Sequence, residues 1–103
     1  MDTPHIDKIF IERKFELHNA SGEVSHVRLC MGEPQQKAND DWSCQFQIMG
    51  IGDETIQASF GVDSLHAFLI GLKLAHALLK YLARYEQKKL TWLNNDDLGF
   101  SIE

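Results

Sequence analysis

The spacing of apolar side chains changes at Gly61. Before this residue apolar and polar side chains alternate, which is typical of strands with one buried face. After it apolar residues return every three or four positions, as on one face of a helix. The two periods in this order predict an α+β domain. We expect an antiparallel sheet followed by one long helix that packs on one of its faces.

Four alternating segments before Gly61 predict a four-stranded antiparallel β-meander. The first three segments are residues 5–18, 23–32 and 41–49, and the fourth follows the turn at residues 50–53. Opposed residues of an antiparallel hairpin have a constant index sum and point to the same face. We place the centre of one hairpin near Ser21 and that of the other near Gly52. The expected cross-strand pairs are Leu17–Ser25, Phe15–Val27, Ile48–Ile56 and Phe46–Ala58.

The same alternation assigns side chains to the two faces of the sheet. In the fourth segment it places Ile56, Ala58 and Phe60 inward. Arg13 falls among the inward apolar residues of the first segment, and we expect it near an edge, with its charged end reaching water. The outward face is either an ordinary solvated surface or a flat polar recognition surface. Its expected neighbours are Ser43, Gln45, Gln47, Gln57 and Ser59.

A single helix is predicted from about residue 63 to 86. Asp63 or Ser64 is suited to cap its N-terminus, and Lys80, Arg84 and two further lysines suit its C-terminal end. The segment Leu90–Glu103 is expected to pack back on the domain as a short tail, with a further strand as the alternative. The expected core stripe of the helix consists of Leu65, Phe68, Leu69, Leu72, Ala75, His76, Leu79 and Leu82.

A second apolar stripe follows helical spacing beside the core stripe. A helix that covers one sheet face needs only one such stripe. Either the tail, with Trp92 and Phe100, covers the second stripe, or the stripe binds a second copy of the chain or another protein. The residues of this possible interface are Ala67, Ile70, Gly71, Leu74, Leu78, Tyr81 and Tyr85.

Length and composition indicate one globular domain that spans residues 1–103. Apolar residues make up 44% of the chain, and the formal net charge is −5. A chain of this size buries enough surface to fold without metals or disulfides. An acidic domain without a basic stripe is a poor binder of nucleic acid or of anionic membranes. The N-terminus lacks the pattern of a secretory signal, so we expect a cytoplasmic protein.

The segment Gly61-Val62-Asp63-Ser64-Leu65 is similar to the phosphopantetheine attachment motif of acyl and peptidyl carrier proteins, in which the serine carries the prosthetic arm. Carrier domains are helical bundles, whereas strands are predicted before this motif. Asp-Ser is also favourable capping chemistry at a helix N-terminus. Capping is therefore the preferred interpretation, and a carrier protein modified at Ser64 is kept as the alternative.

No catalytic, cofactor or metal site is predicted. Cys30 and Cys44 are expected on opposite faces of the sheet, too far apart for a disulfide. No two of the five histidines stand four apart on the helix, and zinc motifs are lacking. The residues 94–97 lack the ligand spacing of a calcium loop. We expect that the protein is not an enzyme.

Three motifs together resemble a family of small uncharacterised bacterial proteins. They are Trp42-x-Cys44-x-Phe46-x-Ile48, the Gly61–Leu65 segment, and Asp97-x-Gly99-Phe100 after Leu90-x-Trp92. The resemblance covers roughly residues 41–100. It implies a bacterial cytosolic protein of unknown function and assigns no site residues.

The leading functional hypothesis is a non-enzymatic binding module that interacts with a protein partner or with itself through the helix. A toxin-neutralising immunity protein is one concrete form of this hypothesis, because such proteins are often small, acidic and α+β. The carrier protein is the alternative from a different class.

Overall fold

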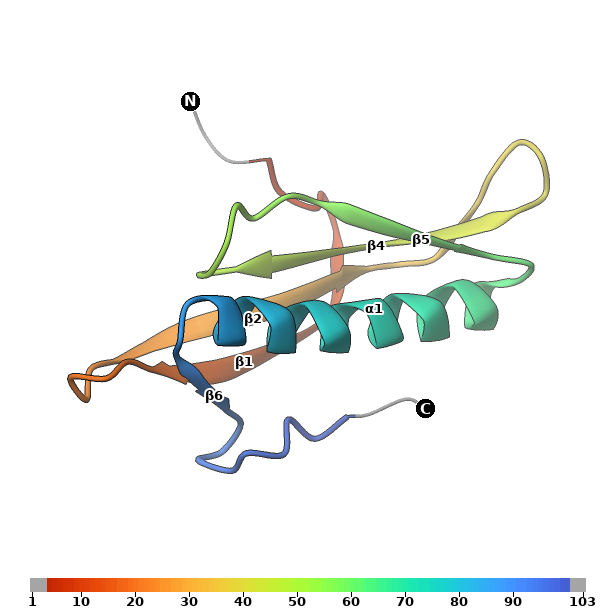
Figure 1. The fold of residues 1–103 in the computed structure, drawn as a ribbon. Coiled ribbons are helices and arrows are strands. Elements are labelled where there is room, and N and C mark those ends of the chain that lie inside the picture. Colours follow the sequence, from red (N-terminus) through yellow and green to blue (C-terminus); the bar gives the residue numbers. More distant parts are fainter. Residues whose placement is uncertain (1–3, 101–103) are drawn as a thin grey trace.

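A computed structural model describes residues 4–100 as one antiparallel sheet with one long helix against one of its faces (Figure 1). The predicted α+β class is therefore confirmed. The elements along the chain are β1 (Ile9–His18), β2 (Val24–Gly32), β3 (Gln35–Gln36), β4 (Trp42–Met49), β5 (Gln57–Gly61), α1 (Ser64–Tyr85) and β6 (Lys89–Thr91).

The sheet contains the predicted meander and two short additional strands. Its order is β3-β4-β2-β1-β6, and β5 also pairs with β4. β3 continues β2 after the interruption at Glu33 and Pro34, and both pair with β4. β6, which lies in the segment predicted as a tail or a further strand, pairs with the end of β1.

The first hairpin has the register that the sequence predicts. Leu17 pairs with Ser25, and Phe15 pairs with Val27. The turn is held by the side chain of Asn19, whose Oδ1 accepts hydrogen bonds from the backbone N–H groups of Ser21 (3.1 Å) and Glu23 (2.9 Å). This asparagine is a strong turn residue because its amide oxygen can replace a backbone acceptor.

The register predicted for the second hairpin is wrong by one residue. Ala58 pairs with Gln45 instead of Phe46, and Ser59 pairs with Cys44. A shift of one residue turns every side chain of a strand to the other face. Ser59 is therefore buried against the helix, whereas Phe60, predicted inward, is 60% exposed.

The loop between β4 and β5 explains this shift, because it is longer than a tight turn around Gly52. Ile51 is buried within the loop, and Gly50, Gly52 and Glu54 all have positive φ. The Glu54 side chain accepts a hydrogen bond from the Gly50 N–H at 2.8 Å. Because of this internal structure, β5 pairs with β4 one residue away from the register that a tight turn centred on Gly52 would give.

α1 begins as predicted, and its buried face agrees only in part with the predicted core stripe, with which it shares Ala75 and Leu79. Asp63 is the N-cap, and its carboxylate accepts a hydrogen bond from the His66 N–H at 2.7 Å. Leu65 and Leu69, predicted in the core, are 63% and 40% exposed. The face that is buried consists of Ala67, Gly71, Ala75, Leu79 and Ala83.

Small residues set this orientation, because they let the helix backbone lie close to the sheet. A Cβ atom at Gly71 would lie 2.9 Å from Ser59 Oγ, and one at Gly61 would lie 2.5 Å from the Ala67 nitrogen. The Ser59 hydroxyl donates to the Ala67 carbonyl oxygen at 2.7 Å and lies 3.2 Å from the Cys44 carbonyl oxygen. The larger apolar side chains of α1 are thereby placed on its two flanks.

The segment after α1 packs beside the helix on the same side of the sheet (Figure 1). Leu98 is buried, and its carbonyl oxygen accepts a hydrogen bond from Arg13 Nη1 at 3.0 Å. The Arg13 guanidinium lies 3.7 Å from the ring centroid of Trp92, at a distance typical of a cation–π contact. This contact explains the charged residue on the inward face of β1. Ile102, expected in the tail, lies outside the described residues.

By length and composition α1 would suffice to cross a membrane, and it is the one such helix in residues 4–100. In this fold it lies along the sheet with its small-residue face buried. The predicted lack of a membrane partner stays a prediction.

The substitution Gly71→Leu tests the close contact between α1 and the sheet. The added side chain would push Ser59 and Met31 away from α1, so we expect the free energy of unfolding to fall by about 2 kcal/mol. The control Lys73→Leu places the same side chain at an exposed position of α1 and should change it by less than about 0.5 kcal/mol. Urea denaturation measures both values, and equal effects would contradict the packing.

Candidate functional site

One apolar flank of α1 remains uncovered within the described residues. We call Ile70, Leu74, Leu78, Tyr81 and Tyr85 the helix flank. Leu74, Tyr81 and Tyr85 are 47%, 58% and 75% exposed, whereas Ile70 and Leu78 are half-buried. The two tyrosine rings stack with centroids 6.0 Å apart.

Two residues predicted in this interface do not belong to it. Ala67 and Gly71 are buried between α1 and the sheet, where Gly71 meets Ser59. They are therefore unable to contact a partner. Their helical spacing matches that of the exposed stripe, but their small size brings the helix close to β4 and β5.

The tail covers the opposite flank of α1, so the interpretation in which Trp92 and Phe100 cover the second stripe is wrong. Phe100 packs edge-on against His76, with ring centroids 5.2 Å apart, and also approaches Phe15. His76 lies on the side of α1 that faces away from Tyr81 and Tyr85, so Phe100 packs on that side. Trp92 and Phe100 thus cover apolar surface, but not the helix flank.

A groove of about 340 Å³ runs between the helix flank and the loop after β4. Its acidic side is formed by Asp53 and Glu54. Hydrogen bonds from the Thr55 side chain and N–H lower the pKa of Asp53, which keeps this carboxylate charged. The remaining lining residues are Ile48, Ile51, Thr55, Gln57, Leu78, Tyr81, Leu82 and Tyr85.

Basic side chains border the helix flank on its other side. Arg84 follows Tyr81 by three residues and Lys73 follows Ile70 by three, which places each next to the flank on the helix surface. Both are exposed and point away from the buried face of α1. Neither belongs to an ion pair within residues 4–100. The flank therefore lies between an acidic loop and a basic row.

The outward face of the sheet differs from the predicted flat polar surface. Gln57 and Ser59 are on the helix side because of the register shift. Gln47 is buried under the N-terminal segment, and its Nε2 donates to the carbonyl oxygens of Pro4 (2.6 Å) and Glu54 (2.8 Å). Of the expected neighbours only Gln45 is exposed on the outward face, because Ser43, which also faces outward, is 5% exposed.

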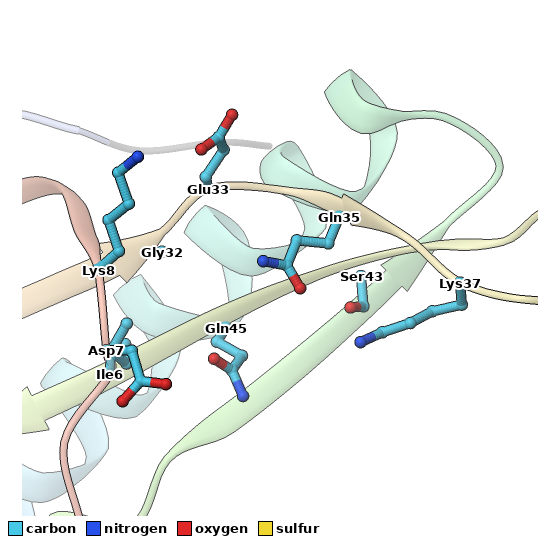
Figure 2. Close-up of a pocket in the computed structure, with 9 residues that line it drawn as sticks. All are labelled: Ile6, Asp7, Lys8, Gly32, Glu33, Gln35, Lys37, Ser43 and Gln45. Carbon is cyan, nitrogen blue, oxygen red and sulfur yellow. The ribbon is translucent and has the colours of Figure 1, made fainter.

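Ser43 and Gln45 line a polar cleft of about 300 Å³ on this outward face (Figure 2). The segment of residues 6–8 forms one wall and β3 with Lys37 forms the other. No sequence pattern predicts this cleft, because residues 4–8 cross β2 and β4 through long-range contacts that leave no periodic signal. The full lining consists of Ile6, Asp7, Lys8, Gly32, Glu33, Gln35, Lys37, Ser43 and Gln45.

The cysteines show the predicted arrangement. Cys30 pairs with Gln47 on the outward face, whereas Cys44 belongs to the core on the helix side. Both are buried free thiols. Burial raises the pKa of each thiol, which disfavours the reactive thiolate.

Ser64, the residue of the carrier alternative, is the first residue of α1 and is exposed. It lies at the edge of an apolar groove of about 450 Å³ that includes Phe10, Trp42 and Leu65. Strands precede it, as the sequence predicted, in place of the bundle that carrier domains use. Within residues 4–100, no three His, Cys, Asp or Glu side chains gather as metal ligands would.

The chain belongs to a family described as a domain of unknown function, DUF6968, whose model matches residues 11–102. This agrees with the resemblance to an uncharacterised family. Among curated proteins no match was found. No solved structure matches the chain either.

His76 makes the packing of the tail sensitive to pH. Burial, together with the nearby Lys80 cation, lowers the pKa of His76 from its ordinary value of 6.5, against the smaller opposing effect of Asp97. The unfolded chain therefore binds this proton at a higher pH than the folded chain, and stability falls as the pH drops below about 6.5.

We expect the free energy of unfolding to decrease from pH 7.0 to pH 5.5, and to decrease less in the variant His76→Gln. Urea denaturation of both proteins at one protein concentration measures the two slopes. Equal slopes would show that His76 does not carry this dependence.

Proposed function

We propose that the domain is a non-enzymatic protein-binding module whose helix flank binds a second copy of the chain. The observation that carries the proposal is the uncovered row of Leu74, Tyr81 and Tyr85 beside a groove. Exposed apolar patches of this kind mark interaction surfaces, and tyrosine is enriched in them.

The charges beside the helix flank favour a second copy over an unrelated partner. A two-fold interface is self-complementary, so each border of the flank must suit the other copy. About an axis parallel to α1, the acidic border of one copy faces the basic border of its partner. Asp53 lies beside the C-terminal part of α1, at the level of Arg84, so this pair meets twice across the axis.

The test of the apolar contact is multi-angle light scattering over a range of concentrations. The parent protein should have twice the mass of one chain at high concentration. Leu74→Glu would bury a charge in the contact and should weaken self-association at least tenfold, which corresponds to ~1.4 kcal/mol. The control Leu65→Glu changes an exposed leucine on the opposite flank of α1 and should leave the dimer intact.

A charge exchange tests the orientation. Arg84→Glu alone and Asp53→Arg alone each place like charges at both contacts of a homodimer. Mixing the two variants restores opposite charges at both contacts, so the mixture should form heterodimers while each variant alone is monomeric. A parent that stays monomeric, a Leu65→Glu variant that dissociates, or a mixture that does not associate would contradict the proposal.

A further inference from the structure

The polar cleft on the outward face of the sheet is a second surface, independent of the helix flank. It lies on the face opposite α1, and shares no residue with the groove beside the flank. Its size is at the lower end of the range of small-molecule sites. The proposed self-association neither requires nor excludes a ligand there.

The walls of the cleft are held by specific contacts. Ile6 is buried against Gly32, where a Cβ atom would lie 3.3 Å from Ile6 Cγ2. The hydrogen bond from Gln47 to the Pro4 carbonyl fixes the same segment. On the other side, Lys37 is the first residue of a turn. Its backbone N–H donates a hydrogen bond to the Asp41 carbonyl oxygen at 2.7 Å, which closes the turn. The cleft is therefore formed before any ligand binds.

Charged groups of both signs face this cleft without partners among residues 4–100. Asp7, Lys8, Glu33 and Lys37 take part in none of the ion pairs of this part of the chain. In Figure 2, Asp7 and Lys37 are directed into the cleft from opposite ends, whereas Lys8 and Glu33 point outward at its rim. The formal charge of these four side chains sums to zero.

The floor between the two charged ends can hydrogen-bond in both directions. Gln35 and Gln45 each carry an amide that donates and accepts, and Ser43 adds a hydroxyl. None of these three side chains has a hydrogen-bond partner among the described residues. Figure 2 shows them between Asp7 and Lys37. The order along the cleft is thus an acid, then amides and a hydroxyl, then an ammonium group.

We infer that this cleft binds a short peptide with free termini. Its α-ammonium group would contact Asp7, its carboxylate would contact Lys37, and its amide would hydrogen-bond with Gln35 and Gln45. A phosphate group bound at Lys37 would leave Asp7 without a cationic partner, and an apolar ligand would desolvate charged groups without compensation. A molecule charged at both ends with an amide between them satisfies each group.

Isothermal titration calorimetry with glycyl-glutamine tests the inference. We expect saturable binding of one dipeptide per chain. The same dipeptide with an acetylated N-terminus and an amidated C-terminus lacks both charges and should bind at least tenfold more weakly. Free glutamine carries both charges on one carbon and should also bind at least tenfold more weakly, because it reaches only one end.

Substitutions assign the two ends. Asp7→Asn and Lys37→Met should each weaken dipeptide binding about tenfold or more, and both positions are exposed, so circular dichroism should show an unchanged fold. The control Lys14→Met removes an exposed lysine of β1 outside the cleft and should have no effect. Absent binding, unchanged binding in both cleft variants, or equal binding of the blocked dipeptide or of free glutamine would overturn the inference. None of these outcomes depends on whether the chain self-associates, which light scattering tests separately.

Discussion

The arrangement of this fold depends on the contact of α1 with β4 and β5 around the Ser59 hydroxyl. This hydroxyl donates to the Ala67 carbonyl oxygen and lies within hydrogen-bond distance of the Cys44 carbonyl oxygen, so one side chain joins two strands and the helix. Glycines at positions 61 and 71 leave the space that this contact needs. A buried hydroxyl is tolerated in the core because its hydrogen bond is satisfied.

The surfaces available for binding follow from this close contact. Because the buried face of α1 consists mainly of small residues, its large apolar side chains lie on the two flanks. The tail covers one flank through Phe100 and is fastened to β1 by Arg13. The other flank, with Tyr81 and Tyr85, has no cover among residues 4–100. On the far face of the sheet the N-terminal segment crosses β2 and β4, and a polar cleft results.

Sequence periodicity predicted the class of fold, the first hairpin to the residue and the N-terminal cap of α1. These features are local. The alternation of side chains determines the fold class, the position of the turn determines the register of the first hairpin, and one side chain determines the cap. The face of β5 was not predictable in this way, because its register depends on the inner structure of the loop that buries Ile51. All five residues of the helix flank belong to the predicted second stripe, which wrongly included Ala67 and Gly71 because helical spacing alone does not separate them from the flank. The polar cleft depends on long-range packing of Ile6 and carries no periodic signal.

Ser59, and not Ala58, faces the helix, and a pair of leucine substitutions tests this orientation most directly. Ser59→Leu would remove the hydrogen bond to Ala67 and crowd Gly71, so the free energy of unfolding should fall by about 3 kcal/mol or more. Ala58→Leu adds the same side chain on the exposed face and should change it by less than about 0.5 kcal/mol. A greater loss for Ala58→Leu than for Ser59→Leu in urea denaturation would contradict the account.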